Sequence, residues 1–280
     1  MIQIPAFLNG EYMPVAECRV SPLDRGFLFG DAVYELIPVY NRKAFCMSQH
    51  LARLARSVEQ VHIQNPYTPT QWAAIIEKLI QQSDDEDLAV YIQVTRGVAK
   101  RDHIFPENVN PTVFAMANPM ARVAGEELQN GVELITVKDI RWQRCDIKVT
   151  GLLANILAKQ EAIQSSAYEA ILIRDGFALE GSASNLFVVR NGTVYTHPED
   201  NLVLPGVTRD FILGLLNELE VEFREQAIPE EWLYSANELW VTSSAREILA
   251  ATKIDKRVVG KGVPGELWKD VHALYQKSIA

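Results

Sequence analysis

The residue whose type and surroundings most suggest chemistry is Lys148, which lies between Ile147 and Val149. It precedes a segment, residues 152–162, in which apolar residues recur at helical spacing. A lysine with β-branched neighbours at such a junction can be held partly buried as a reactive amine. Taken alone, the stretch fits an ordinary exposed lysine better, because most lysines are exposed. Whether Lys148 has a chemical role therefore depends on other polar residues.

Two further segments could bind an anion. Gly206, Val207 and Thr208 form a glycine-containing turn at the start of an expected helix, where free N–H groups and the helix dipole favour a phosphate. Ser243 and Ser244 follow an expected strand and offer hydroxyl and amide donors. Each segment also fits an ordinary helix start. The sequence contains no P-loop, Rossmann or nucleophile-elbow motif, so a bound phosphate would be held in another way.

One carboxylate and two cationic side chains complete the set of candidate residues. Glu180 lies in a turn of small residues, where it could be solvated or could face a cationic partner. Arg101 and His103 lie in a long polar loop, residues 96–108, between two expected strands. Such loops inside compact domains often carry function, although a solvated loop of mixed charge is the alternative. A shared ligand would give all of these residues a role.

The elements that must position these residues fall into two groups along the chain. In the first group, apolar periodicity predicts strands near residues 7–13, 32–40, 88–95 and 112–117, with turns at 9–10 and 41–43. One helix is expected to follow an N-cap at Ser48, and a second to begin near Thr70. Residues 21–30 are expected to form a loop of turn-forming residues.

The second group of elements follows an expected linker over residues 119–131, which has little apolar periodicity. Strands are expected at 132–140, 169–174, 186–190, 193–196, 221–226 and 238–242, and helices over 207–219 and 265–277. The sequence therefore predicts an α+β chain with a domain at 1–118, the linker, and a larger domain at 132–280. Both domains are expected to contain mostly antiparallel strands.

Length, composition and charge argue against several classes of protein. The chain has 280 residues, of which 48% are hydrophobic and 22% charged, as is typical of soluble globular proteins. Its net charge of −9 argues against general nucleic-acid binding and against binding an anionic membrane surface. The three cysteines and five histidines show no disulfide or metal-ligand spacing. With no signal peptide or membrane-spanning run, the sequence predicts a cytoplasmic protein without a metal site.

Seven motifs, in order, resemble those of the fold-type IV pyridoxal-phosphate enzymes, or class IV aminotransferases. The motifs are DRGFLFGDAVYE at 24–35, HLARL at 50–54, RCDIK at 144–148, AKQEA at 158–162, EGSASN at 180–185, LPGVTRD at 204–210 and VTSSAREI at 241–248. The resemblance covers nearly the whole chain. It implies a two-domain α+β fold, with a small N-terminal α/β domain and a larger C-terminal domain that has a mostly antiparallel, β-barrel-like core.

The resemblance also implies a cofactor, pyridoxal 5′-phosphate, and a role for most of the candidate residues. Lys148 would bind the cofactor covalently as a Schiff base and would act as general acid and base. Glu180 would pair with the pyridine nitrogen, and Arg53 would contact the phosphate. The other phosphate contacts would come from Gly206, Val207, Thr208, Ser243 and Ser244.

The polar loop is most similar to that of the D-amino-acid aminotransferases within the family. In that group Arg101 and His103, together with Tyr34, would trap the α-carboxylate that amino acids and 2-oxo acids share. The reaction implied is transamination between a D-amino acid such as D-alanine and a 2-oxo acid such as 2-oxoglutarate. Because family dimers place this loop over the neighbouring subunit's active site, a homodimer is implied as well.

Three residues depart from the family pattern, and other functions stay open. Ala183 stands where serine is frequent, Gly151 where a polar residue is common, and Asp102 places a negative charge inside the expected trap. The same fold also serves aminodeoxychorismate lyases, which eliminate pyruvate, and L-branched-chain aminotransferases. A non-catalytic protein on this fold is a further alternative, which the presence of Lys148 and Glu180 disfavours.

Overall fold

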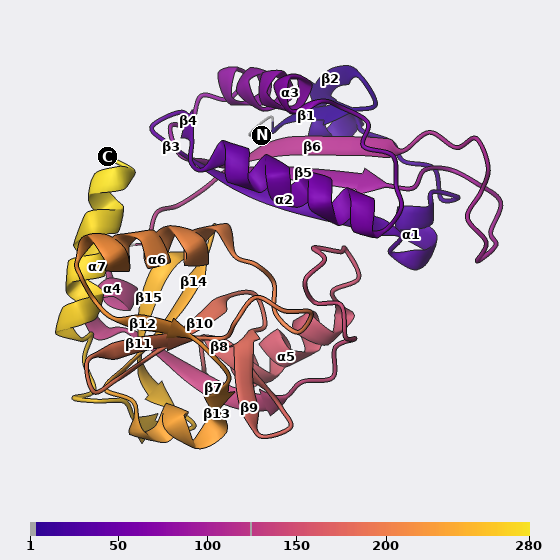
Figure 1. Cartoon of the computed structure of the whole chain (residues 1–280). Helices are drawn as coiled ribbons and strands as arrows, with labels where there is room; N and C mark the ends of the chain where they lie inside the picture. Colours follow the sequence, from indigo (N-terminus) through magenta and orange to yellow (C-terminus); the bar gives the residue numbers. More distant parts are fainter. Residues whose placement is uncertain (1–3, 124) are drawn as a thin grey trace. The chain divides into compact units, whose positions relative to one another are not determined.

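The computed structural model describes residues 4–123 and 125–280, which form two compact units (Figure 1). One unit holds the chain up to Ala121 together with Ile147–Gly151. The other holds Arg122–Asp146 and Leu152–Ala280. The short segment Ile147–Gly151 therefore clusters with the first unit, whereas the sequence prediction places it in the larger domain.

The first unit is built on a six-stranded sheet with the order β2-β1-β6-β5-β3-β4. All neighbouring strands in it are antiparallel. The strands are β1 (Pro5–Leu8), β2 (Glu11–Pro14), β3 (Ala32–Tyr40), β4 (Lys43–Ala44), β5 (Leu88–Thr95) and β6 (Thr112–Pro119). The Asn-Gly turn is confirmed, since Asn9 and Gly10 adopt the positive φ angles, 50° and 102°, that such a turn requires.

Helices α2 (Met47–Gln60) and α3 (Pro69–Gln81) pack on this sheet and share one apolar core with it. The predicted N-cap at Ser48 is wrong, because α2 begins at Met47 and Cys46 occupies the cap with φ of 50°. Helix α3 begins one residue before Thr70. Thr68 caps it, and its hydroxyl accepts the N–H of Gln71 in a reciprocal capping box. Proline at the first helical position, Pro69, suits this start.

A five-residue helix, α1 (Arg25–Phe29), lies in the segment that was expected to be a loop. The carboxylate of Asp24 caps it by accepting the N–H of Gly26 at 2.8 Å. Gly30 ends it in the left-handed conformation, with φ of 65°. A helix of little more than one turn has no apolar periodicity, so the sequence pattern alone shows only its turn-forming residues. Three residues, Val15–Glu17, form the 3-10 turn η1.

The second unit is built on a ten-stranded sheet with the order β12-β11-β10-β14-β15-β7-β8-β9-β13, and β16 pairs with β15. It is mostly antiparallel and curls into a half-barrel, which confirms the predicted fold class. Its parallel pairs are β11–β12, β15–β7 and β7–β8. The strands are β7 (Val132–Lys138), β8 (Glu169–Arg174), β9 (Phe177–Gly181), β10 (Asn185–Arg190), β11 (Thr193–Thr196), β12 (Phe223–Glu225), β13 (Ile228–Pro229), β14 (Glu238–Ser243), β15 (Glu247–Ile254) and β16 (Arg257–Val258).

The helices of the second unit are α4 (Glu126–Asn130), α5 (Leu153–Gln164), α6 (Val207–Glu218) and α7 (Glu266–Ser278), with a 3-10 turn η2 (Glu230–Ser235). Helix α5 packs on β8 through Ala158 and Ala162, which are buried. Its larger apolar side chains point outward instead: Leu153 is 70% exposed and Ile156 is 60% exposed. In the described part of the chain, no helix is long and apolar enough to cross a membrane.

Candidate active site

Lys148 is held against strand β3 by backbone contacts. Val149 forms an antiparallel bridge with Val33, and the N–H of Tyr34 donates to the carbonyl of Lys148 at 2.9 Å. The N–H of Lys148 donates to the hydroxyl of Ser57 on α2 at 3.4 Å. The lysine Nζ lies 3.2 Å from the Tyr34 hydroxyl and 4.3 Å from the ring centroid. The structure therefore brings two predicted site residues, Lys148 and Tyr34, into contact.

Arg53, the predicted phosphate ligand, lies in a buried charge cluster next to that lysine. Its Nε and Nη2 atoms donate to the two carboxylate oxygens of Glu35 at 2.9 and 2.6 Å. Glu35 is fully buried on β3. Burial by itself disfavours the ionised carboxylate, but Arg53 and His50 together lower the pKa of Glu35 well below its usual range. Whether Arg53 also contacts a phosphate stays a prediction.

Burial favours the neutral form of His50 in this cluster. It is 1% exposed, and its Nδ1 lies 3.0 Å from the Glu35 carboxylate. Among the described residues, none forms a hydrogen bond with its Nε2. A protonated ring would therefore bury an unsatisfied N–H, next to the positive charges of Arg53 and Lys148. Burial lowers the pKa of His50, and these cations lower it further, against the opposing hydrogen bond from Glu35.

The other predicted substrate residues, Arg101 and His103, lie on the exposed loop between β5 and β6. The guanidinium carbon of Arg101 is 5.3 Å from the centroid of the Phe29 ring, and the His103 ring is 5.5 Å from it. The Asp102 carboxylate accepts the N–H of Ile104 at 3.3 Å, so it caps a turn of its own loop. The structure thus brings Arg101 and His103 together at Phe29, and Tyr34 to Lys148, as two groups within this unit.

In the second unit, Glu180 is fixed by donors on several sides. Its Oε1 accepts from Nη1 of Arg141, and its Oε2 accepts from the Asn185 side chain and the N–H of Leu204, each at 3.1 Å. Arg141 also binds Asp139 through Nε and Nη2, both at 3.0 Å. Burial alone would lower the pKa of Arg141, but the Glu180 and Asp139 carboxylates raise it. The orientation of the buried Glu180 carboxylate is therefore fixed by these hydrogen bonds.

The predicted phosphate residues of this unit gather around Asn185. A Cβ atom at Gly206 would lie 1.9 Å from the Asn185 side-chain oxygen, so any larger residue would require the Asn185 side chain to move. Gly206 is the N-cap of α6 and no side chain caps that helix, which leaves the first N–H groups without intrahelical partners. Asn185 pairs in register with Thr242, directly before Ser243. Among the described residues, none forms a hydrogen bond with the buried Thr242 hydroxyl.

The turn that carries Ala183 is fixed by hydrogen bonds to the buried carboxylate of Glu169. This carboxylate accepts hydrogen bonds from the hydroxyl of Ser182 and, at 3.1 Å, from that of Ser184. The N–H of Gly181 in turn donates to the carbonyl of Ser184 at 2.7 Å. The two flanking serines are therefore used for structure.

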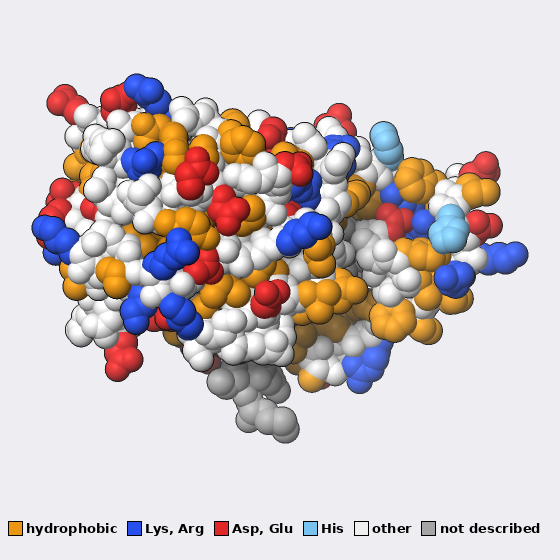
Figure 2. Space-filling view, turned by 90° about the horizontal axis from the view of Figure 1, so that it is seen from below, with side chains coloured by type: hydrophobic (Ala, Val, Ile, Leu, Met, Phe, Trp, Pro, Cys, Tyr) orange, Lys and Arg blue, Asp and Glu red, His pale blue; other side chains and the backbone are white. Residues whose placement is uncertain are grey.

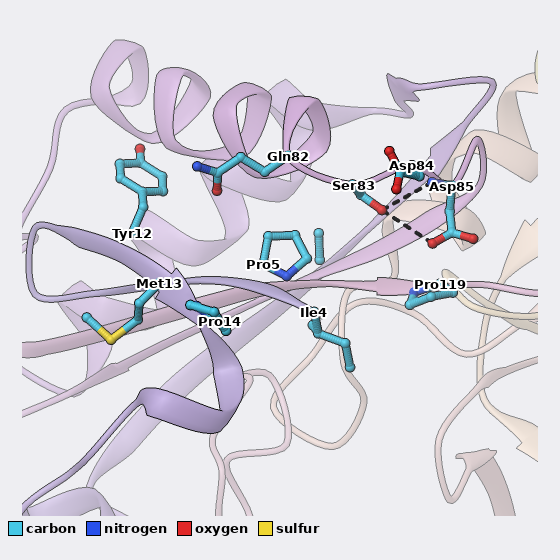
Figure 3. Close-up of a pocket in the computed structure, with 11 residues that line it drawn as sticks. Ile4, Pro5, Tyr12, Met13, Pro14, Gln82, Ser83, Asp84, Asp85 and Pro119 are labelled. Atoms are coloured by element: carbon cyan, nitrogen blue, oxygen red, sulfur yellow. Dashed lines mark hydrogen bonds between the residues drawn. The ribbon is translucent and has the colours of Figure 1, made fainter. Parts of the chain in front are cut away.

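A separate pocket of about 670 Å³ lies at the β1–β2 hairpin of the first unit (Figure 3). Its lining includes Tyr12, Met13, Asp84 and Asp85, and the Ser83 hydroxyl contacts the Asp85 carboxylate. Neighbouring carboxylates repel an anion, so this pocket does not suit a carboxylate or phosphate ligand. None of the predicted site residues is among the residues that line it.

The sequence alone assigns no role to four residues of these clusters, which are Glu35, His50, Arg141 and Asn185. A signal was present for Glu35, because a carboxylate in the apolar strand AVYELIPVY must find a cation when it is buried. For Arg141 the partner lies 39 residues away in the chain, and no spacing rule identifies it.

A family model described as amino-transferase class IV matches residues 32–254. The chain belongs to this family. It is 40% identical over 271 residues to the D-alanine aminotransferase of Bacillus licheniformis, a match that covers 97% of this chain and 95% of the relative. It is 37% identical over 274 residues to the D-alanine aminotransferase of Staphylococcus haemolyticus, with 98% and 97% covered.

Solved structures of class IV aminotransferases share the same fold. The branched-chain amino acid aminotransferase of Escherichia coli matches with a TM-score of 0.94 and 25% identity, over 98% of this chain and 94% of that one. The T.th. branched-chain enzyme, solved with pyridoxamine 5′-phosphate, also gives a TM-score of 0.94, with 26% identity over 100% and 95%. The predicted family and its two-domain fold are confirmed.

The neutral state of His50 makes stability depend on pH. Because the pKa of His50 is lower in the folded chain than its ordinary value of about 6.5, the unfolded chain binds the extra proton first as pH falls. The stability that the neutral form of His50 contributes is fully present above a pH of about 6.5. Below it, the free energy of unfolding should fall by up to about 1.4 kcal/mol per pH unit. We expect His50→Gln to reduce the slope between pH 6.5 and 5, as measured by urea unfolding. Parallel slopes in the two proteins would contradict the neutral histidine.

Proposed function

We propose that this class IV aminotransferase binds pyridoxal 5′-phosphate and that Lys148 is its reactive amine. Three observations fit such a cofactor: an amine held against a hydroxyl in the first unit, a fixed carboxylate in the second, and an uncapped helix N-terminus beside a buried unpartnered hydroxyl. A cofactor with an aldehyde, a pyridine nitrogen and a phosphate requires these three kinds of partner. The related T.th. structure holds pyridoxamine 5′-phosphate.

The cofactor, when bound, supplies an aldehyde that condenses with amines and a ring that accepts electron density. Lys148 Nζ holds it covalently between turnovers and moves the proton at the substrate Cα. The Tyr34 hydroxyl, 3.2 Å from Nζ, orients that amine. Glu180 would pair with the ring nitrogen and would favour its protonated form, because an ionised carboxylate stabilises a neighbouring cation.

The phosphate is assigned to two groups of donors. Gly206, Val207 and Thr208 offer the first N–H groups of α6, a 12-residue helix, and the Thr208 hydroxyl. Ser243 and Ser244 complete the donors of the second unit. These donors would retain the cofactor through its phosphate whenever it is not covalently attached to the lysine.

We infer that the amino donor is a D-amino acid such as D-alanine, with a 2-oxo acid such as 2-oxoglutarate as acceptor. The relatives at 37–40% identity over nearly the whole chain are D-alanine aminotransferases, whereas the branched-chain structures share only 25–26%. Arg101 supplies a guanidinium that fits a carboxylate, and His103 supplies a ring N–H donor. Both side chains contact the Phe29 ring, and Tyr34 supplies a hydroxyl donor. L-branched-chain transamination is the second candidate, which the folds of the solved relatives favour.

The role of Lys148 is tested by replacing it. We expect Lys148→Ala to lose transamination by more than about 10⁴-fold, since both covalent binding and proton transfer depend on one amine. The visible absorbance of the covalently bound cofactor should disappear as well. Lys138→Ala, which removes an exposed lysine from the end of β7, serves as the matched control. A wild-type chain that never acquires cofactor absorbance would refute the proposal.

The substrate is tested with a panel of donors. With 2-oxoglutarate as acceptor, we expect kcat/KM for D-alanine to exceed that for L-alanine and L-leucine by at least about 100-fold, because stereospecific contacts act on the transition state. D-Glutamate formation would be measured by chiral chromatography. A preference for L-leucine would establish the branched-chain alternative. Pyruvate release from aminodeoxychorismate, without transamination of D-alanine, would establish the lyase.

We also propose that the protein is a homodimer. Each unit exposes large apolar side chains: Leu153, Ile156, Leu157 and Ile163 on α5, and Phe27, Ile104 and Phe105 in the first unit. Hydrophobic side chains are also visible among the charged residues on one face of the molecule (Figure 2). Monomers rarely expose clustered apolar residues of this size, and a second copy of the chain would cover them.

The cytoplasmic location stays a prediction from the sequence.

Sedimentation equilibrium measures this assembly directly. We expect a particle of twice the 31.5 kDa chain mass. Ile156→Glu places a charge on the exposed apolar face of α5 and should shift the equilibrium toward the monomer by at least about 10-fold, since burying an unpaired charge in an interface is costly. A wild-type protein that remains monomeric at micromolar concentration would rule out the dimer.

A further inference from the structure

The loop that carries Arg101 and His103 is closed at its base by a close backbone approach. Gly97 follows β5 with φ of 102°, and a Cβ atom there would lie 2.1 Å from the carbonyl oxygen of Asn110. Val98 forms an antiparallel bridge with Asp24, and the N–H of Arg25 donates to the carbonyl of Gly97 at 2.9 Å. The first residues of the loop, Gly97 and Val98, are therefore bound through their backbone to the start of α1.

The side chain of Arg25 reaches further along the same loop. Its Nη1 donates to the carbonyl of Asp102 at 2.5 Å and approaches the carbonyl of Ile104 at 3.4 Å. The residues that carry these two carbonyls flank His103 in the chain, and the first of them, Asp102, directly follows Arg101. The Arg25 side chain is 4% exposed, so water competes little for these bonds.

A partly buried aspartate, Asp31, holds Arg25 in place. Asp31 accepts from Nε of Arg25 at 2.8 Å, and from Nε and Nη2 of Arg96 at 2.7 and 2.9 Å. Burial opposes its ionisation, but the two arginines lower the pKa of Asp31, so it stays charged. The Arg96 guanidinium in turn stacks 3.7 Å from the Phe105 ring centroid on the same loop.

The ring of Phe29, at the other end of α1, supports the loop side chains themselves. Arg25 lies 4.9 Å from its centroid, Arg101 5.3 Å and His103 5.5 Å. One short helix therefore contributes a guanidinium that fixes the loop backbone and a ring that the Arg101 and His103 side chains contact.

We propose that Arg25 is a positioning residue for the substrate carboxylate, acting through Arg101 and His103. This inference rests on the proposed carboxylate trap. The guanidinium fork is essential to it, because one side chain binds a carboxylate with Nε and two carbonyls with Nη1. A lysine ammonium keeps the charge but cannot make all of these bonds in the same directions. Loss of Arg25 displaces the trap and weakens substrate binding, while proton transfer at Lys148 continues.

Steady-state kinetics on the holoenzyme test this role. We expect Arg25→Met to raise KM for D-alanine about 10–100-fold, since a displacement of about 1 Å at a binding group has effects of this size. kcat should change by less than about threefold. Arg25→Lys should give an intermediate KM. Arg19→Met is the matched control, because Arg19 also donates to two backbone carbonyls, at 2.8 Å each, on an exposed turn outside the trap. Its KM should stay at the wild-type value.

A double-mutant cycle separates positioning from general stability. In a background with Arg101→Met and His103→Gln, Arg25→Met should lower kcat/KM by less than about threefold, because the groups it positions are gone. A purely structural role would cost the same in both backgrounds and would overturn the proposal. Hydrogen exchange of residues 99–105 should be faster in Arg25→Met than in Arg19→Met, and equal rates would also overturn it.

The same variants distinguish this inference from the proposed function. If the loop variant with Arg101→Met and His103→Gln keeps the wild-type KM, the trap itself is wrong and the role of Arg25 fails with it. If the loop variant raises KM strongly but Arg25→Met does not, the trap stands and only the positioning role is refuted.

Discussion

Burying a carboxylate costs several kcal/mol unless a cation and N–H donors compensate it, and both units depend on that compensation. Glu35 lies inside the first core because Arg53 binds both of its oxygens and His50 binds one of them. Asp31 is held in the same way by Arg96, which ties the end of β5 to the start of β3. Glu180 is held in the second unit by donors from three separate segments. These pairs join elements that packing alone would leave free to shift, and the site residues lie beside them.

The proposed carboxylate, Glu180, and the proposed reactive amine, Lys148, differ in how firmly their side chains are held. Glu180 has its donors on fixed backbone and side-chain positions, so its direction does not need to change when a ligand arrives. Lys148 is fixed through its backbone, whereas its Nζ meets the neutral hydroxyl of Tyr34. A hydroxyl partner orients an amine without locking it into an ion pair. The Glu180 carboxylate therefore has a fixed direction, whereas the Lys148 amine is free to form and release a bond.

The sequence predicted elements well where a local pattern decides them. Residues 88–95 form the predicted strand because their alternating apolar side chains face one core. The start of α2 was misplaced because Cys46 takes the cap with a positive φ, which no residue type there signals. Helix α1 is too short for a periodic pattern. Contacts made across long chain separations, such as that of Arg141 with Glu180, are set by the tertiary fold. The motif resemblance identifies Glu180 as a site residue, but it does not identify Arg141 as the residue that binds it.

The chain passes between the two units three times, after Ala121, after Asp146 and after Gly151. The five residues that carry Lys148 thus belong to the first unit while both of their covalent neighbours belong to the second. Neither unit corresponds to one continuous stretch of gene. A fragment that ends at the first boundary would keep Tyr34 and Arg53 but lose the amine, and a fragment that starts there would carry the amine without β3. Exchange of either fragment alone would therefore separate the amine from the strand that positions it.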